Sequence, residues 1–199
     1  MIKLYDSALS GNCHKVRMML GILGLPYETA PMNWAKGEQR LDWFGAINPR
    51  RQLPALDDNG TIVWDSQAIL VYLARAYGGE DWLPLTPIGL TRVTQFLMLA
   101  NEEISALAWA RVTVLMKYPR DRLPELQQKG RAGLEVLDKR LQDHAWLAAE
   151  HPTIADIACF PYAGLSPQGD VDLGPYPAVA AWIARIKAWP RYVPMPGLA

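Results

Sequence analysis

Residues 52–70, QLPALDDNGTIVWDSQAIL, decide the fold, because three structural signals follow one another there. Asn59-Gly60 joins two apolar runs, which is the strongest short-range signal of a β-hairpin. Pro54 opens the first run, a position where a residue without an N–H group is tolerated in a strand. Ser66 precedes apolar residues at helical spacing, so we expect it to be the N-cap of a helix. The stretch therefore predicts two strands, joined by a tight turn, and then a helix.

The chain before this stretch predicts a β-α-β unit followed by a second helix. Gly24 and Pro26 end the first helical pattern, and Pro49 follows the end of the second. The strands are expected at residues 2–5 and 27–31, and the helices at residues 16–23 and 41–47.

The second half of the chain lacks strand signals. Residues 79–86 contain Gly and Pro, and we interpret them as a linker between an α/β domain, residues 1–78, and an all-helical domain, residues 87–199. Thr153 and Asp156 form the S/T-x-x-D pattern of a capping box at the start of one helix. Helical patterns cover roughly residues 90–116, 123–142, 153–162 and 177–188.

The composition excludes several classes of protein. Half of the 199 residues are hydrophobic, 20% are charged and the formal net charge is zero. This is typical of a folded protein, with no basic field for nucleic acid and no Lys/Arg-rich segment for a membrane surface. No stretch approaches the ~20 apolar residues of a membrane-spanning helix, and the first residues lack the apolar run of a signal peptide. Because Cys13 and Cys159 make no disulfide framework, we expect a cytoplasmic protein with no nucleic-acid or membrane partner.

Four short motifs occur in the order and spacing of one protein family. They are Ser10-x-x-Cys13-x-x-Val16-Arg17, Asn48-Pro49-x-x-Gln52-Leu53-Pro54-Ala55-Leu56, Asp65-Ser66-x-Ala68-Ile69-x-x-Tyr72-Leu73 and Thr153-Ile154-Ala155-Asp156-Ile157. With them the whole chain resembles a cytosolic glutathione S-transferase of the bacterial, serine-type kind, with a theta-like active-site pattern. The resemblance implies a thioredoxin-like α/β domain, with elements in the order β-α-β-α-β-β-α, followed by an all-α helical bundle. It also implies a cis peptide bond before Pro54 and a homodimer.

The resemblance assigns residues to the parts of glutathione, an extended tripeptide with two carboxylates, one ammonium group and a thiol. Asp65 and Ser66 hold the γ-glutamyl end. Asp65 supplies an anion for the ammonium group, and the helix start at Ser66 offers N–H groups to a carboxylate. The main chain of Leu53, next to Pro54, pairs with the cysteinyl backbone.

Gln39 and Gln52 match the positions that reach the glycine carboxylate in the family. Neither side chain is charged, so Lys36 and Arg40 are candidates for a positive charge at that end. Exposed basic residues are also commonly solvated surface groups, and both interpretations of these two residues stay open.

The thiol of glutathione needs a group that stabilises its ionised form, because a thiol with a pKa of about 8.5 is only ~3% thiolate at pH 7. Ser10, just before the first helix, matches the serine that does this in serine-type transferases, and the Asn12 side-chain amide is a second candidate. Cys13 would instead form a mixed disulfide in a cysteine-type oxidoreductase. A tyrosine-type mechanism is disfavoured because Tyr5 lies inside the first strand. His14 has no partner at metal-ligand spacing, so we expect a solvated helix residue and no metal.

The helical domain is expected to shape the site of a small hydrophobic electrophile. Asn101, Ser105 and Trp109 recur every four residues and so share a helix face, with Arg111 nearby on the same helix. Three functions remain open: a glutathione transferase, a glutathione-dependent thiol–disulfide oxidoreductase or peroxidase, and a non-catalytic binding module with the same fold. The presence of Ser10 together with the expected glutathione-binding residues favours the transferase, with glutathione as co-substrate.

Overall fold

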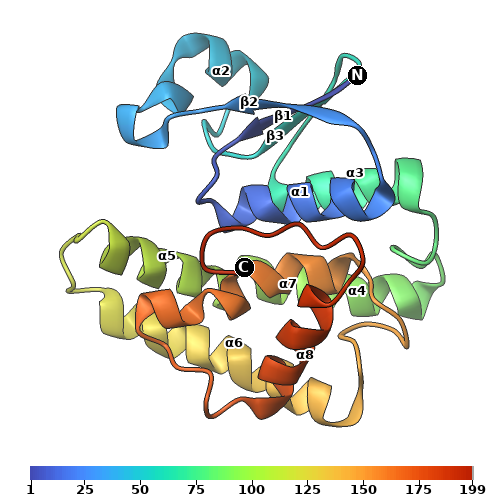
Figure 1. Ribbon diagram of the computed structural model, residues 1–199, viewed down its shortest axis with the longest axis vertical. Coiled ribbons are helices and arrows are strands. Elements are labelled where there is room, and N and C mark those ends of the chain that lie inside the picture. The colour runs from blue at the N-terminus through green and yellow to red at the C-terminus, as the bar shows by residue number, and fades with distance from the viewer. Residues whose placement is uncertain (199) are drawn as a thin grey trace.

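The structure is a computed structural model that describes residues 1–198, so the last residue of the expected helical domain lies outside it. A sheet-containing part and a helical part are stacked end to end (Figure 1). The sheet has the strand order β2-β1-β3-β4. β1 (Ile2–Asp6) is parallel to β2 (Tyr27–Pro31) and antiparallel to β3 (Ala55–Asp58), and β4 (Thr61–Trp64) completes the expected hairpin.

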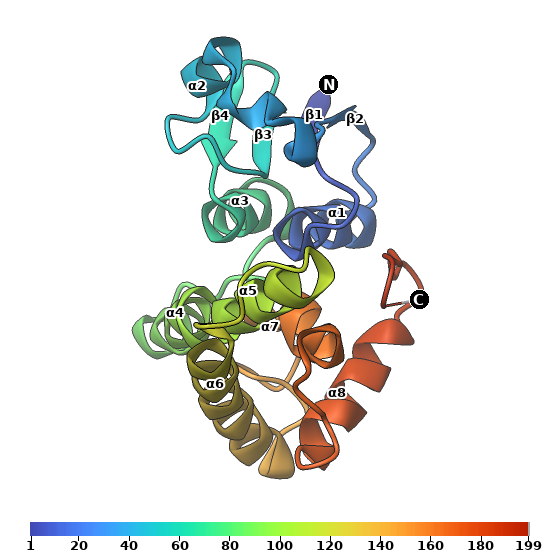
Figure 2. The ribbon, with the colours of Figure 1, turned by 90° about the vertical axis from the view of Figure 1, so that its left-hand side faces the viewer.

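Helices cover both faces of this sheet. α1 (Gly11–Leu23) and α3 (Ser66–Leu73) lie between the sheet and the helical part, whereas α2 (Asp42–Ile47) lies on the opposite face (Figure 2). The order of elements confirms the thioredoxin-like α/β class. Three short turns add to it, two of 3-10 type and one of π type: η1 (Trp34–Lys36), η2 (Glu38–Arg40) and η3 (Ala74–Gly78).

The C-terminal part is all-helical, as expected. Its elements are α4 (Pro87–Asn101), α5 (Glu103–Leu115), α6 (Leu123–Asp143), α7 (Ile154–Gly164), the 3-10 turn η4 (Ser166–Gly169) and α8 (Pro177–Lys187). The single helix expected over residues 90–116 was wrong, because the backbone leaves the helical conformation at Glu102, with φ −99° and ψ −81°. Buried apolar residues continue at intervals of three and four through this break, which hides it from the periodicity: Val93, Leu97, Ala100, Ile104 and Leu107.

α7 is the central helix of the helical part, and it also contacts α1 of the sheet-containing part. The residues from Ile154 to Ala163 are all buried. The expected capping box at its start is present, with Asp156 accepting from the Thr153 N–H at 2.9 Å. The same carboxylate accepts from Trp182 Nε1 at 3.0 Å, and its burial raises the pKa of Asp156 to about 6. One continuous core therefore joins both parts of the chain.

His14 is buried, so its expected place on a solvated helix face was wrong. α1 lies between the sheet and the helical part (Figure 2), where it contacts α7, and the C-terminal segment also reaches it at Val193. Residues 13–20 are therefore all buried, and this part of the helix has no solvated face. His14 Nε2 lies 2.6 Å from the Val193 carbonyl oxygen, and its Nδ1 has no hydrogen-bond partner among the described residues. Burial lowers the pKa of His14 to about 4.

Replacement of His14 by Gln should cost more stability near neutral pH than near pH 4. In the wild type the unfolded chain takes up a proton on this group near pH 6.5, but the folded chain does so only near pH 4. The stabilisation relative to a non-titrating residue is therefore present above pH 6.5 and is lost, by at most about 1.4 kcal/mol per pH unit, as the pH falls to 4. Urea unfolding of both proteins across this range measures the difference in the free energy of unfolding. Asp156, whose pKa is raised in the folded chain, changes stability with pH in the opposite sense, but it does so in both proteins and cancels in the difference. A difference that does not change with pH would contradict the prediction.

Candidate active site

A cavity of about 1370 Å³ lies where the sheet-containing part meets α4 and α5. All eight residues predicted to bind or activate glutathione line it: Ser10, Asn12, Gln39, Gln52, Leu53, Pro54, Asp65 and Ser66. They come from four separate segments, namely the start of α1, the turn η2, the turn before β3 and the start of α3. The fold thus brings the predicted set together in one hollow.

Ser10 is the N-cap of α1 and lines the cavity at the same time. Its Oγ accepts from the N–H of Cys13 at 3.3 Å. A hydroxyl group has one hydrogen to donate besides its two acceptor lone pairs, so capping the helix leaves that hydrogen available. The positive end of the α1 dipole also faces this position, where it favours a negative charge.

Asn12 connects the start of α1 with the start of α3. Its side-chain oxygen lies 3.3 Å from the Ser66 hydroxyl, which can donate either to it or to Gln67 Oε1 at 2.6 Å. The Asn12 N–H donates to the Tyr162 hydroxyl of α7 at 3.1 Å. Asn12 therefore contacts the α3 side of the cavity as well as the helical part of the chain.

Asp65, and not Ser66, is the N-cap of α3, so that detail of the sequence interpretation was wrong. Asp65 Oδ1 accepts from the N–H groups of Gln67 and Ala68 at 3.0 and 3.4 Å. Asp65 has the left-handed φ of 75°, which costs a non-glycine residue conformational energy and places its carboxylate at the helix start. Ser66 becomes the first residue of α3, and its N–H has no partner within the helix.

A basic residue that the sequence interpretation overlooked pairs with this carboxylate. Arg50 Nη1 lies 3.2 Å from Asp65 Oδ2, and both side chains line the cavity. The Arg50 N–H donates to the buried Asn48 side chain at 2.9 Å, and Asn48 Nδ2 donates to the Gln52 carbonyl at 2.7 Å. The signal in the sequence was the Asn48-Pro49 motif, followed directly by two arginines.

The cavity end near η2 also has positive charges. Arg40 and Arg51 line it, whereas Lys36, the other candidate for a positive charge, does not. Arg51 Nη2 pairs with Asp42 at 3.0 Å. Gln39 also lines this end of the cavity, its side chain is buried, and its Oε1 has no hydrogen-bond partner among the described residues.

The peptide bond between Leu53 and Pro54 is cis, which confirms the expectation from the resemblance. Neither Cys13 nor Tyr5 lines the cavity. Cys13 is fully buried, and this burial raises the pKa of its thiol to about 12, so it has almost no thiolate at neutral pH. Tyr5 packs against the rings of Trp43 and Phe44 in a separate small core.

The helical part supplies the opposite wall. Asn101, Ser105 and Trp109 line the cavity as expected, and Trp109 is 56% exposed. They do not share one helix, however, because the break at Glu102 leaves Asn101 at the end of α4 and puts Ser105 and Trp109 on α5. Arg111 is buried and donates through Nη1 to the Leu9 carbonyl at 2.8 Å, so it supports the loop before Ser10.

A second buried arginine holds the same loop from within the sheet-containing part. Arg17 Nη1 pairs with Asp6 at 2.5 Å and contacts the Ser7 carbonyl oxygen at 3.4 Å, and its Nη2 donates to the Ala8 carbonyl at 3.2 Å. Together with Arg111, it fixes three successive carbonyl groups immediately before the catalytic candidate.

Two protein-family models match the chain. Residues 4–81 match the model described as "Glutathione S-transferase, N-terminal domain", and residues 100–190 match "Glutathione S-transferase, C-terminal domain". Glutathione S-transferase D7 of Anopheles gambiae is 34% identical over 190 residues, covering 92% of this chain and 85% of that protein. The chain belongs to the glutathione S-transferase family.

Solved structures of bacterial glutathione S-transferases agree with this assignment. The enzyme from Pseudomonas fluorescens Pf-5 superposes with a TM-score of 0.91 at 36% identity, covering 98% of each chain. The one from Xanthobacter autotrophicus Py2 has a TM-score of 0.91 at 31% identity, covering 100% of this chain and 98% of that one. The predicted fold and enzyme class, a glutathione S-transferase, are thus confirmed.

Two further findings concern metal binding and membrane-spanning helices. Within residues 1–198, the His, Cys, Asp and Glu side chains form no cluster that could bind a metal ion. None of the helices in the described part of this glutathione S-transferase has the length and apolar character needed to cross a bilayer.

Proposed function

We propose that this glutathione S-transferase binds glutathione along the sheet edge of the cavity, ionises its thiol at Ser10 and transfers the thiolate to a small hydrophobic electrophile. The observation that carries the proposal is the position of Ser10, whose hydroxyl lines the cavity at the N-terminus of α1. A hydroxyl hydrogen bond and the helix dipole both stabilise a thiolate more than a thiol.

The charges along the cavity match those of glutathione. The γ-glutamyl ammonium group pairs with Asp65, and the neighbouring carboxylate meets the Ser66 N–H and Arg50. The cysteinyl backbone pairs with the main chain of Leu53, beside Pro54.

The glycine carboxylate lies at the other end, among Gln39, Gln52 and Arg40. Gln39 and Gln52 supply amide donors there, and Arg40 supplies the positive charge that the two glutamines lack. This arrangement puts the thiol between the two ends, at the start of α1, where Ser10 and Asn12 lie.

The electrophile occupies the half of the cavity next to α5. Apolar groups dominate this wall: Leu9, Ala108, Val112, Leu115 and Met116. Trp109 adds an exposed indole face on which a flat aromatic compound can stack. The enzyme contributes positioning and thiolate stabilisation, and the electrophile supplies the leaving group or the activated double bond.

A thiol–disulfide oxidoreductase or peroxidase is the alternative chemistry. A solved structure from Pseudomonas fluorescens Pf-5, 28% identical and with a TM-score of 0.84, is described as having two glutathione molecules bound. In this chain the burial of Cys13 argues against a mixed disulfide at that residue. Any such reaction would have to proceed through oxidised glutathione.

Activity measurements distinguish these functions. Purified protein is assayed with glutathione and, in turn, a chloronitrobenzene, a hydroperoxide and a small disulfide. We expect saturable conjugation of the aromatic halide. Turnover of the disulfide or hydroperoxide alone would assign the oxidoreductase function, and tight glutathione binding without turnover would assign a binding module.

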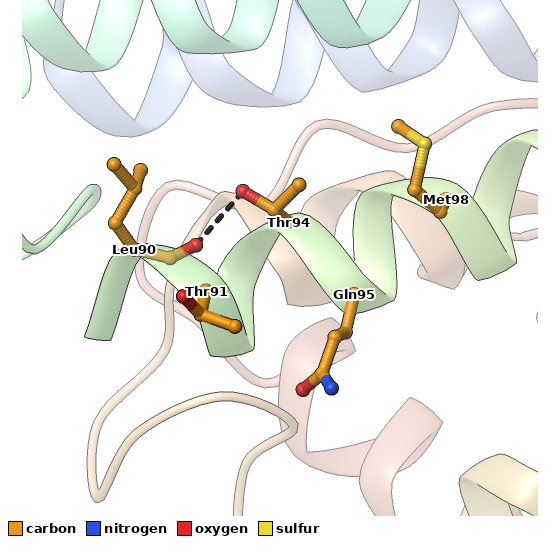
Figure 3. Close-up of a pocket in the computed structure, with 5 residues that line it drawn as sticks. All are labelled: Leu90, Thr91, Thr94, Gln95 and Met98. Carbon is orange, nitrogen blue, oxygen red and sulfur yellow. Dashed lines mark hydrogen bonds between the residues drawn. The ribbon is translucent and has the colours of Figure 1, made fainter. Parts of the chain in front are cut away.

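We further propose a cytoplasmic, detoxifying homodimer. β4, α3 and α4 lie along the same side of the molecule (Figure 2). On α4 a shallow hollow is formed by Leu90, Thr91, Thr94, Gln95 and Met98 (Figure 3). Thr91 and Thr94 donate back to carbonyl groups of their own helix, at 2.7 and 2.8 Å, so the surface that remains is largely apolar.

Replacement of Met98 by Glu should convert the dimer into a monomer at micromolar concentration, because two copies of the charge would be buried against an apolar face in a two-fold interface. Met98 is 54% exposed in the single chain. Val136→Glu is a matched control, since Val136 is a 49% exposed apolar residue on the outer face of α6. Sedimentation analysis gives the masses. A monomeric wild type, or a dimeric Met98→Glu variant, would contradict the proposal.

A further inference from the structure

Arg111 of α5 is a buried arginine whose hydrogen bonds reach the loop before Ser10. The residue is 5% exposed and lines the cavity. Its Nη1 donates to the Leu9 carbonyl oxygen at 2.8 Å, and its Nε donates to Gln168 Oε1 at 2.6 Å. The guanidinium group is planar and rigid, so the bond that fixes Nε at Gln168 also fixes the direction of Nη1 toward Leu9.

Gln168 belongs to the turn η4, which packs closely against α5. Gly169 allows this approach, because a Cβ atom at that residue would lie 2.8 Å from the Arg111 backbone nitrogen. Gln127 Nε2 donates to the Gly169 carbonyl oxygen at 3.0 Å and ties the turn to α6 as well. Gln168 does not line the cavity. It is therefore a fixed acceptor for Arg111, and it can affect the reaction only through other residues.

The carbonyl group that Arg111 holds belongs to the peptide group between Leu9 and Ser10. The N–H of the same peptide group donates to the Ser7 carbonyl oxygen at 2.9 Å. This peptide bond is trans, so its C=O and N–H point in opposite directions within one plane, and holding both fixes the orientation of the plane. The Cα atom of Ser10 lies in that plane, so the direction in which its side chain leaves the backbone is fixed too.

Side-chain packing contributes little to the position of this loop. Leu9 is 49% exposed, and Ala8 is exposed as well. The loop therefore depends on the hydrogen bonds to its carbonyl groups. Of these, the bond from Arg111 lies directly before Ser10 in the chain.

We propose that Arg111, oriented by Gln168, is a positioning residue for thiolate formation, which fixes the Leu9–Ser10 peptide group and so aims the Ser10 hydroxyl at the sulfur of glutathione. The role rests on the function proposed above, and it acts through Ser10 rather than on the sulfur itself. A donor that is held in place before the substrate binds needs no reorganisation when the negative charge develops.

The test replaces Gln168 by Leu, because Arg111 then keeps its charge and loses the acceptor that orients it. We expect the apparent pKa of bound glutathione, followed by the ultraviolet absorbance of the thiolate, to rise. The kcat for conjugation should fall about three- to tenfold at neutral pH, with little change in KM for glutathione, and should recover as the pH approaches the pKa of the free thiol.

Gln142→Leu is the matched control for this variant. Gln142 Nε2 donates to Asp138 at 3.1 Å on α6, and Gln142 does not line the cavity either. The control removes a glutamine hydrogen bond of the helical part and should leave the thiol pKa and kcat unchanged.

Gln168→Glu separates positioning from the positive charge of Arg111, which would also stabilise a thiolate. The carboxylate keeps an acceptor for Arg111 Nε, but it pairs the guanidinium charge with a negative one. If Arg111 acts by position, Gln168→Glu retains the thiol pKa of the wild type, and Gln168→Leu raises it. A rise in Gln168→Glu as large as that in Gln168→Leu, or larger, would show that Arg111 acts by its charge and would overturn the positioning role.

A Ser10→Ala background tests whether the effect passes through Ser10. There, Gln168→Leu should cause no further rise in the thiol pKa, because no hydroxyl remains to be aimed. An unchanged thiol pKa in Gln168→Leu, or equal effects with and without Ser10, would overturn the role of Arg111 and leave the proposed function intact. A wild-type protein that binds glutathione without lowering its thiol pKa would instead overturn the proposed function itself, and the positioning role with it.

Discussion

Replacement of Ser10 by Ala should lower kcat for conjugation roughly ten- to hundredfold at neutral pH, which corresponds to the loss of one hydrogen bond to a charged group. A shift of ~2 units in the thiol pKa is worth ~2.7 kcal/mol and makes the thiolate the major form at pH 7. We expect Ser10 to supply part of that stabilisation and the helix dipole to supply another part. The loss should shrink as the pH rises, because the solvent then ionises the thiol without help. Rate profiles against pH for both proteins measure this.

Cys13→Ala is the control for the chemistry, because Cys13 is fully buried and does not line the cavity. It should leave kcat almost unchanged and reduce stability slightly. If Cys13→Ala abolished turnover while Ser10→Ala were tolerated, the enzyme would be a cysteine-type oxidoreductase. If only Asn12→Ala produced the large loss, the Asn12 amide would be the group that stabilises the thiolate.

Ser10→Ala also removes the N-cap of α1, so its effect on folding must be measured separately. The Cys13 N–H loses its partner, which costs about 1 kcal/mol of stability. Urea unfolding shows this cost directly. A stability loss of that size leaves the enzyme folded, so the pH dependence of kcat still reports on the thiolate.

Local signals in the sequence were sufficient for most of the fold. The Asn59-Gly60 turn, the helix ends at Gly24 and Pro49 and the capping box at Thr153 each depend on residues close together in the chain. The structure has the expected element in each of these places. The predicted site residues also come together in one cavity, because they lie at the ends of such elements.

Features that depend on packing between distant segments escaped the sequence. The burial of His14 depends on Val193, and the contact of Tyr162 with Asn12 spans 150 positions. The break at Glu102 was hidden because apolar periodicity continues through it. Arg50 was overlooked because its partner, Asp65, is brought close only by the turn before β3.

The loop before Ser10, residues 7–9, is supported from both parts of the chain. Arg17 contacts the carbonyl groups of Ser7 and Ala8 from α1, and Arg111 donates to that of Leu9 from α5. A group that must donate to a thiolate is more effective when its position is fixed before the substrate arrives, because no reorganisation is then required. In the proposed function, the contacts of the helical part with this loop would therefore contribute to thiolate formation as well as to the electrophile site.

Replacement of Asp65 by Asn should raise KM for glutathione by roughly ten- to hundredfold, because the ammonium group of the γ-glutamyl end loses its anion. The variant keeps the side-chain oxygen that accepts from the Gln67 and Ala68 N–H groups, so the cap of α3 is retained. The kcat at saturating glutathione should change much less, since the γ-glutamyl end is remote from the thiol. Initial rates over a range of glutathione concentrations give both constants.

Asp65→Ala separates binding from folding. It removes the anion and the cap together, so we expect the same rise in KM as in Asp65→Asn and an additional loss of about 1 kcal/mol in the free energy of unfolding. If Asp65→Asn left KM unchanged while Asp65→Ala raised it, Asp65 would act only by ordering the start of α3. Glutathione would then be held at its γ-glutamyl end by the Ser66 N–H and Arg50 alone.

Because Arg50 is paired with Asp65 in this structure, Asp65→Asn also frees a guanidinium group beside the incoming ammonium group of glutathione. This adds charge repulsion to the lost attraction.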